Sequence, residues 1–255
     1  MRLKLLAAQV TNAVAVAVLR LSQIHPLKVN QFMIETEQTA ASDGGFPAPL
    51  QETRWLEFST QPSTQGLIAG VDEVGRGALF GPVVAAAVIL PEVALRHLVA
   101  ANIKDSKKLS GNQRELLAQQ ICELAIDWGI GFASTTEIDR MNILQATLLA
   151  MKRAVLKLRV QPTLCLIDGN QLVTGLPIPQ QTIVKGDERS IVIASASIVA
   201  KVWRDALVLR LASKYPMYDL ERNKGYGSKR HLMALQQYGA SRLHRKSFRP
   251  CQHNS

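Results

Sequence analysis

Apolar runs rich in β-branched residues alternate with short polar turns through most of the chain after residue 65. The first two runs, at 67–72 and 82–90, are joined by the glycine-punctuated turn EVGRGALFG, which predicts two adjacent strands. Each of the other runs is bounded by turn residues and predicts one further strand. These runs lie at 128–134, 163–167 and 181–184.

Longer stretches between and after these runs carry apolar residues at helical spacing. Ser110 followed by Gln113 is a capping-box pattern, and Thr136 followed by Asp139 predicts a second helix start. Ser190 is expected to cap a long third helix. The predicted helices cover about 110–127, 136–160 and 190–215. Three consecutive strands followed by alternating helices and strands favour an α/β fold with a mixed central sheet flanked by helices.

The first 65 residues differ from the rest. A charge-free apolar run at 5–19 follows two basic residues and superficially resembles a secretory signal. It contains polar residues, is too short to span a bilayer, and has no convincing cleavage site after it. We expect a short amphipathic helix there, or translated sequence upstream of the true start. Residues 38–65 have the Ser, Thr, Gln, Gly and Pro content of a flexible linker. We therefore predict that residues 1–65 are a poorly ordered extension and that residues 66–250 form the folded domain.

The composition indicates the cellular compartment and the class of binding partner. The 255 residues are 47% hydrophobic and 20% charged, which is typical of a globular protein with one good-sized core. The three cysteines form no C-x-x-C pattern, so a disulfide framework is not expected and a reducing cytosol fits best. The net charge of +10 makes a polyanionic partner the natural expectation.

The basic excess is concentrated near the C-terminus. Residues 215–255 carry 8 Lys and Arg against 2 Asp and Glu, while residues 1–65 have no net charge. Basic and tyrosine side chains are interspersed there, as in many nucleic-acid contacts, although a solvated surface would also give some of this pattern. These residues are Lys224, Lys229, Arg230, Arg242, Arg245, Lys246 and Arg249 with Tyr218, Tyr226 and Tyr238.

Four carboxylates follow apolar strands. Asp72 and Glu73 end the first strand, Asp168 ends LCLID, and Asp187 closes IVKGD. Open α/β sheets place their ligands at the carboxyl ends of strands, so we expect the four acids to share one pocket. Neighbours in a strand point to opposite faces, so Asp72 and Glu73 converge only if the chain bends or ends there, which the following glycines permit.

Acids in such proximity repel one another and favour bound cations. Oxygen ligands select Mg²⁺ or Mn²⁺, and two such ions about 3.5–4 Å apart activate a water and stabilise the leaving oxygen of a phosphodiester. A basic protein with this cluster is interpreted as a metal-dependent nuclease. A single strand-end acid would more often be an ordinary turn residue, but four in the same setting weaken that interpretation.

Other chemistries find little support. The glycines at 70–81 miss the P-loop and dinucleotide patterns, and the five histidines show no pairing at ligand spacing. Cys165 lies inside an apolar strand and is expected in the core. Ser195 and Ser197 are interpreted as small residues that let a helix pack closely on the sheet.

Seven segments taken together resemble, in order and spacing, the motifs of bacterial ribonuclease HII. They cover about residues 66–250 and read AGVDEVGRGALFGPVVAAAVIL, DSKKLS, EIDRMNILQATLLAM, LIDGN, VKGDERS, IASASIVAKVWRD and NKGYGSKRH. The sister family ribonuclease HIII typically has Lys where Arg76 stands and carries an additional N-terminal domain. Arg76 and the linker-like composition before residue 66 favour the HII family.

The resemblance implies an RNase H-like fold with a C-terminal helical, basic segment that contacts substrate at about 215–250. It implies an endonuclease that hydrolyses the RNA strand of RNA/DNA hybrids and nicks 5′ of single ribonucleotides in duplex DNA, leaving 5′-phosphate and 3′-hydroxyl ends. Asp72, Glu73 and Asp168 match the family's ligands for Mn²⁺ or Mg²⁺, and Asp187 matches its fourth catalytic acid.

The resemblance also implies the substrate contacts. Gly75, Arg76 and Gly77 match a motif that contacts the ribonucleotide's 2′-hydroxyl largely through backbone groups, where a side chain would block close approach. Tyr226 matches a tyrosine that packs on the deoxyribose after the ribonucleotide. The basic residues expected to contact phosphates are Lys107, Lys108, Lys201 and Arg204, of which the last two share a helix face.

We therefore expect a cytoplasmic monomer that acts on nucleic acid and not at a membrane. A competing hypothesis is a non-catalytic binder of hybrid or structured nucleic acid, in which the acids serve only the fold. A third is a different nuclease on the same fold, such as a junction resolvase, which the GRG and KGYG segments argue against.

Overall fold

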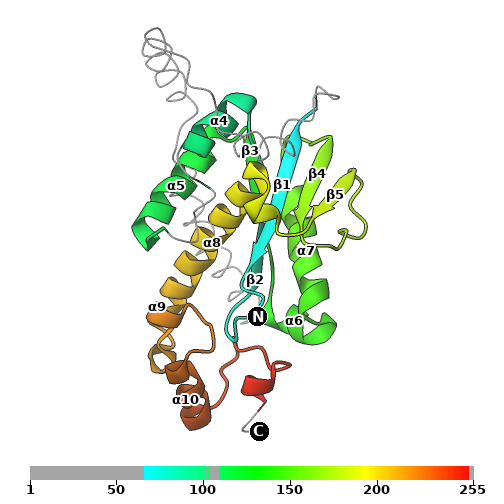
Figure 1. The fold of residues 1–255 in the computed structure, drawn as a ribbon. Coiled ribbons are helices and arrows are strands. Elements are labelled where there is room, and N and C mark those ends of the chain that lie inside the picture. The colour runs from blue at the N-terminus through cyan, green and yellow to red at the C-terminus, as the bar shows by residue number, and fades with distance from the viewer. Residues whose placement is uncertain (1–65, 101–102, 104–108, 253–255) are drawn as a thin grey trace, which may run out of the picture.

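A five-stranded sheet in the order β3-β2-β1-β4-β5 forms the centre of the protein (Figure 1). The computed structural model describes residues 66–100, 103 and 109–252. The predicted extension at 1–65 lies outside the described residues. The strands are β1 (Ile68–Val74), β2 (Val83–Ile89), β3 (Asp127–Ala133), β4 (Leu164–Asp168) and β5 (Gln180–Ile183). β1, β2 and β3 pair antiparallel, while β4 pairs parallel to both β1 and β5, so the predicted mixed sheet is confirmed.

Helices cover both faces of this sheet (Figure 1). One face packs against α4 (Glu92–Ala100), α5 (Gly111–Leu124) and α8 (Ile191–Ala212). The other packs against α6 (Thr135–Met141) and α7 (Ile143–Leu156). β2 is buried along its whole length because its alternate side chains contribute to the two apolar clusters.

Glycine in β1 lets α8 approach the centre of the sheet. A Cβ atom on Gly70 would lie 2.1 Å from the carbonyl carbon of Val192. Because Gly70 has no side chain, the N-terminal half of α8 can lie directly on β1. This close packing brings α8 side chains beside the acids that follow in the same strand.

Two of the predicted helix starts are at the expected residues and one is wrong. Ser110 and Gln113 form the capping box of α5, and Ser190 precedes α8, although its side chain makes no capping bond. The second predicted helix starts at a capping box of Ser134 and Glu137 instead of Thr136 and Asp139. Two residues before the predicted start, the Ser134 hydroxyl accepts the Glu137 N–H and the Glu137 carboxylate accepts the Ser134 N–H, so the capping box forms there.

The same predicted helix is interrupted at Asn142. This residue has φ 74°, outside helical geometry, and its side chain accepts a hydrogen bond from the Gln145 N–H at 3.1 Å. Asn142 therefore ends α6 and caps α7 at once. Asp139 has another partner, since its carboxylate accepts the N–H groups of Lys246 and Ser247 in the C-terminal segment.

The C-terminal segment forms a small helical unit at the end of α8, at the bottom of the view (Figure 1). Its elements are η4 (Pro216–Tyr218), α9 (Leu220–Asn223), α10 (Lys229–Tyr238) and η5 (Arg249–Cys251). They share a third apolar cluster with Leu79 and Phe80, which lie in the loop between β1 and β2. The predicted C-terminal helical segment is thus confirmed. Among the described residues, no helix is long and apolar enough to cross a membrane.

Candidate active site

Three acidic side chains meet at one edge of the sheet. Asp72 and Glu73 lie near the end of β1, and Asp168 is the last residue of β4, the parallel neighbour of β1. One carboxylate oxygen from each of the three lies within 4.8 Å of the others. We call these three residues the acid cluster. β1 continues to Val74, so the expected end of the strand at the acids is not found. The Asp72 carboxylate instead turns back and accepts the Glu73 N–H at 2.7 Å.

Each member of the acid cluster is held from a different direction. Asp72 is 5% exposed, and its carboxylate is hydrogen-bonded to the Ser197 side chain on α8. Glu73 forms an ion pair with Arg76 at 3.2 Å. Asp168 accepts the Gly186 N–H at 2.6 Å. The cluster is therefore fixed by its own strands, by α8 and by the loop after β5.

Burial and mutual repulsion raise the pKa of every acid in the cluster. Burial raises the pKa of Asp72 well above its usual range, and the charges of Glu73 and Asp168 raise it further. Burial also raises the pKa of Glu73, against the opposing charge of Arg76, and that of Asp168. Without a cation the three groups resist ionising together. This set of carboxylate oxygens fits a divalent cation that prefers hard ligands.

Asp187 lies beside the acid cluster without joining the group of three. It is half-buried in η3 (Gly186–Glu188), and its charge helps to raise the pKa of Asp168. A Cβ on Gly186 would lie 2.6 Å from a methyl carbon of Ile193, so η3 packs tightly on α8. Of the four acids predicted to share one pocket, the three from β1 and β4 meet and Asp187 lies next to them. Asp187 does not close a strand as predicted, because β5 ends at Ile183.

The turn after β1 contains two glycines with different roles. Gly75 has φ +88°, and a Cβ there would lie 2.1 Å from the Nε atom of Arg204, so the fold itself requires glycine. Gly77 is exposed, and a Cβ there would meet nothing within 4 Å. Arg76, between them, is exposed and linked to the acid cluster through Glu73.

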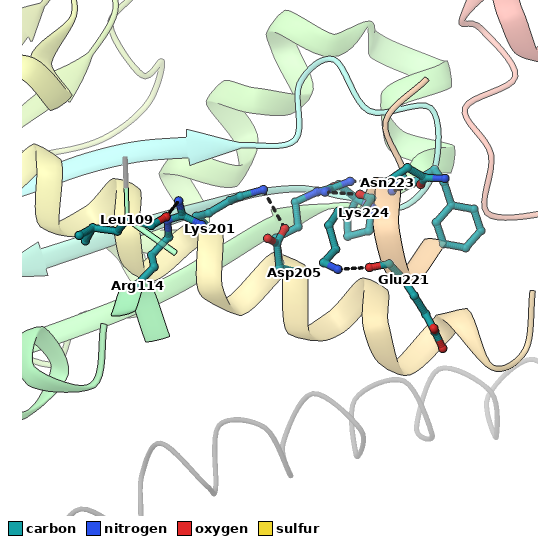
Figure 2. Close-up of polar contacts among 11 residues, drawn as sticks. Leu109, Arg114, Lys201, Asp205, Glu221, Asn223 and Lys224 are labelled. Atoms are coloured by element: carbon teal, nitrogen blue, oxygen red, sulfur yellow. Dashed lines mark hydrogen bonds and ion pairs between the residues drawn. The ribbon is translucent and has the colours of Figure 1, made fainter. Parts of the chain in front are cut away.

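Tyr226 lies over the two basic residues of α8 that were predicted to share a face. Its ring centroid is 5.6 Å from Lys201 Nζ and 5.4 Å from the guanidinium carbon of Arg204, so the shared face is confirmed. Lys201 also forms an ion pair with Asp205 at 2.9 Å, one turn further along α8 (Figure 2). Nearby, the Lys224 side chain bonds to the backbone carbonyl of Glu221 (Figure 2).

The expectation that Arg204 contacts a phosphate does not fit its placement. Its side chain is fully buried, because the loop from β1 to β2 and the loop before α10 cover it. Its guanidinium donates to the backbone carbonyls of Pro82, Lys224 and Phe80. Lys107 and Lys108 lie outside the described residues.

Three features around the site were not predicted from the sequence. Ser197, interpreted there as a packing residue, bonds to Asp72, and nothing in its spacing distinguishes it from Ser195, which bonds only to the helix backbone. Arg245 belongs to the basic C-terminal segment yet is fully buried. His231 and His244 form a buried pair with their Nε2 atoms 3.0 Å apart, although their sequence separation gave no signal.

Comparison with known proteins gives a consistent result. The family model described as Ribonuclease HII matches residues 69–251. The chain is 68% identical over 221 residues to a ribonuclease HII from a Nostoc species, covering 86% of this chain and 98% of that protein. It is 69% identical over 207 residues to ribonuclease HII of Trichormus variabilis, covering 81% and 92%. The crystal structure of ribonuclease H2 from Pyrococcus horikoshii is similar with a TM-score of 0.64 at 26% identity, covering 73% of this chain and 95% of that one.

Proposed function

Since the chain belongs to the ribonuclease HII family of metal-dependent endonucleases, which cleave the RNA strand of RNA/DNA hybrids, we propose that it also nicks duplex DNA 5′ of single ribonucleotides. The proposed products carry 5′-phosphate and 3′-hydroxyl ends. The family and the RNase H-like fold expected from the motifs are confirmed. The nicking of isolated ribonucleotides and the end chemistry are the proposed properties.

The observation that carries the proposal is the position of the acid cluster beside an exposed glycine turn. The ion pair between Glu73 and Arg76 joins the two directly. Within the described residues, the N–H groups of Arg76 and Gly77 have no protein acceptor, and both residues are exposed. A pair of outward-facing donors next to a cation-binding cluster suits recognition of a ribose hydroxyl beside the phosphate to be cut.

The acid cluster would hold the divalent ions. Mg²⁺ and Mn²⁺ both suit its oxygen donors, and when bound they would supply charge to activate a water and to stabilise the leaving oxygen. Asp72, Glu73 and Asp168 orient that charge because they are fixed by Ser197, Arg76 and Gly186 respectively. Asp187 is the proposed fourth catalytic acid, and the effect of its charge on the pKa of Asp168 supports a position close to the acid cluster.

The glycine turn and Tyr226 would select the substrate. The fold does not require glycine at position 77, because a Cβ there would contact no other residue. The open space at its Cα would let a ribose approach the N–H groups. Tyr226, held over Lys201 and Arg204, presents a half-buried ring that would pack on the following deoxyribose. Phosphate contacts by Lys201, Lys107 and Lys108, the monomeric state and the cytoplasmic location stay predictions.

The test is a nicking assay on a labelled DNA duplex with one ribonucleotide. With Mn²⁺ or Mg²⁺ we expect one product, cut on the 5′ side of the ribonucleotide, while an all-DNA duplex and a reaction with EDTA stay intact. A 3′-hydroxyl end is checked by extension with a polymerase. Cutting of the continuous hybrid with no nick at the single ribonucleotide would overturn the proposal.

The same assay separates the competing hypotheses. A non-catalytic binder would bind hybrid in a salt-dependent way, with or without EDTA, and would never cut. A junction resolvase would cut a four-way DNA junction that contains no ribonucleotide. Either result in place of the nick would favour that alternative.

A further inference from the structure

Two arginines are completely buried behind the substrate-facing surface. Arg204, on α8, and Arg245, in the C-terminal segment, each have 0% exposure. Among the described residues neither forms an ion pair with a carboxylate. Their guanidinium groups bind backbone carbonyls of two loops, at 75–82 and 224–228, which we call the paired loops. Arg245 binds the first loop and Arg204 binds both.

Arg245 binds the glycine turn. Its Nη2 atom donates to the Gly75 carbonyl at 2.6 Å, its Nη1 atom to the Arg76 carbonyl at 2.7 Å, and its Nε atom to the Gly81 carbonyl at 3.0 Å. The backbone N–H of Arg245 also donates to the Leu79 carbonyl at 2.9 Å. One buried side chain thus fixes both ends of the first loop.

Arg204 joins that loop to the second one. Its Nη2 atom donates to the Phe80 carbonyl at 2.9 Å, and its Nη1 atom to the Lys224 carbonyl at 2.9 Å. The backbone connects the loops as well, since the Leu79 N–H donates to the Gly225 carbonyl at 2.8 Å. Tyr226 follows directly and lies over the same guanidinium. The ring and the turn are therefore parts of one hydrogen-bonded unit.

Because the peptide bond is planar, these contacts also determine the direction of the N–H groups in the glycine turn. In a trans peptide the carbonyl of one residue and the N–H of the next point in opposite directions. By holding the carbonyls of Gly75 and Arg76, Arg245 directs the N–H groups of Arg76 and Gly77 away from the interior. These are the two exposed N–H groups that have no acceptor within the described part of the chain.

We propose that Arg245 is a specificity-determining positioning residue, which sets the direction of the Arg76 and Gly77 N–H groups and, with Arg204, holds them in register with Tyr226. The proposal rests on the proposed function, in that these groups contact the ribose and the sugar that follows it. Arg245 touches no substrate itself and acts through the backbone it binds.

The energetic cost of the arrangement argues for such a role. Removing a guanidinium from water without a carboxylate partner is unfavourable, and an apolar residue of similar volume would fill the same space at less cost. Burial, and then the nearby charge of Arg204, lower the pKa of Arg245 to about 9. Only a rigid, planar group with several donors, however, can bind three carbonyls at once.

The experiment compares Arg245→Lys, which keeps the charge and loses the forked geometry, with Arg245→Gln, which loses the charge. Arg153→Lys is the matched control, because Arg153 also donates to a backbone carbonyl, that of Phe132, and lies on α7 away from the site. Each variant is also made together with Gly77→Ala, whose Cβ would block approach to the turn. The kcat/KM on the single-ribonucleotide duplex, the Kd for an all-DNA duplex and the thermal midpoint are measured for all.

We expect Arg245→Lys to lower kcat/KM on the single-ribonucleotide duplex about tenfold, which is roughly the effect of losing one hydrogen bond. The Kd for the all-DNA duplex should not change. In the Gly77→Ala background the same change should cost less than about twofold, because both act on the same turn. Arg153→Lys should lower the thermal midpoint without changing kcat/KM.

Three results would overturn the inference. One is an unchanged kcat/KM in Arg245→Lys. Another is a loss that is fully additive with Gly77→Ala, which would indicate a general effect on the fold. The third is failure of both Arg245 variants to fold while Arg153→Lys folds, since Arg245 would then serve the core alone. Absence of nicking by the unaltered protein would instead reject the proposed function, so the two failures are distinct.

Discussion

The acid cluster and the paired loops are neighbours along the chain, because the loop at 75–82 directly follows β1, but they are built around buried charges of opposite sign. In the acid cluster the carboxylate oxygens face one another, and burial and repulsion raise their pKa values. At the paired loops the buried guanidinium groups of Arg204 and Arg245 face loop carbonyl oxygens, which accept their hydrogen bonds. The first region is completed only by an external cation, while the second is complete without a ligand.

This difference sets the sign of mutational effects. Neutralising an acid removes repulsion from the metal-free protein and destroys a binding site. Shortening a buried arginine leaves carbonyls without donors and should destabilise the protein. Stability and activity should therefore change in opposite directions when an acid of the cluster is neutralised, and in the same direction when a buried arginine behind the paired loops is shortened.

The largest expected effect is that of Asp72→Asn. Asp72 is the most buried acid of the cluster. Losing a metal ligand should lower cleavage at least about 100-fold, since even residues that merely support ligands cost 10–100-fold. Binding of the duplex should persist because the basic surface is intact. The thermal midpoint of the metal-free protein should rise. Cleavage rates, binding by fluorescence anisotropy and a melting curve with EDTA check the three parts.

Asp127→Asn is the matched control for this prediction. Asp127 is also buried at a strand end, but its carboxylate accepts the N–H groups of Arg159, Val160 and Trp128. Although burial raises its pKa, these backbone hydrogen bonds lower it overall. Its neutral variant should melt at a lower temperature and cut normally. Equal cleavage by Asp72→Asn and the parent protein would contradict the assigned role.

Gly77→Ala tests the part of the paired loops that lies next to the acid cluster. A Cβ at Gly77 has open space in the free protein, so the thermal midpoint should not change. The methyl group should nevertheless obstruct a ribose and lower kcat/KM by roughly 10–100-fold, the loss expected for one or two hydrogen bonds. Gly75→Ala is the contrast, because its Cβ would collide with Arg204 and should destabilise the fold. Normal cleavage by Gly77→Ala would show that the turn does not approach the substrate.

Tyr226→Ala should change substrate preference more than overall activity. The ring is held over Lys201 and Arg204 and is the part of the paired loops proposed to pack on a deoxyribose. We expect about a tenfold greater loss on an isolated ribonucleotide than on a continuous hybrid, the size of one stacking contact. Tyr238→Ala, an exposed tyrosine at the end of α10, is the control. An equal loss on both substrates would contradict the assignment.

The acid cluster was predictable from sequence and the paired loops were not. Asp72 and Asp168 end or nearly end apolar strands, and the edge of a parallel pair brings such residues together whatever the details of packing. The glycine turn was visible in the sequence pattern, but its substrate role came only from the resemblance to a family. Its geometry depends on Arg245, which is 170 positions away along the chain from Gly75.

The features that the sequence did not predict share one physical cause, which is their dependence on distant or irregular parts of the chain. Helical spacing correctly placed Lys201 and Arg204 on one face, but it carries no information about what covers that face. The break at Asn142 depends on a positive φ that helical periodicity does not register. The segment after α10 has no regular period, so the burial of Arg245 and His244 had no local signal.

The last expected effect is on stability instead of activity and concerns the acid sensitivity of the paired loops. The Ser241 N–H donates to His244 Nδ1, so the His244 proton resides on Nε2 and is donated to His231 Nε2. The His231 proton then resides on Nδ1 and is donated to the Tyr226 carbonyl at 2.9 Å. Both rings are neutral in this chain of hydrogen bonds, and an added proton on either ring would interrupt it.

The direction of the pH dependence follows from this arrangement. Burial, and then the neighbouring His231, lower the pKa of His244 from 6.5 to about 4, and burial lowers that of His231 against the charge of Asp219. The unfolded chain takes up protons near pH 6.5, so this stabilisation is present above that pH and is lost as the pH falls toward 4. Between pH 7 and 5 the free energy of unfolding should fall by about 2 kcal/mol.

The acid cluster responds in the opposite direction, because its raised pKa values mean that protonation relieves repulsion. The histidine contribution is therefore isolated by comparing chemical denaturation of the parent protein with that of His244→Gln at pH 7 and 5. The parent should lose more stability than the variant, while His97→Asn, an exposed histidine on α4, should behave as the parent does. Identical pH dependence in the parent and His244→Gln would mean that the buried pair does not stabilise the paired loops.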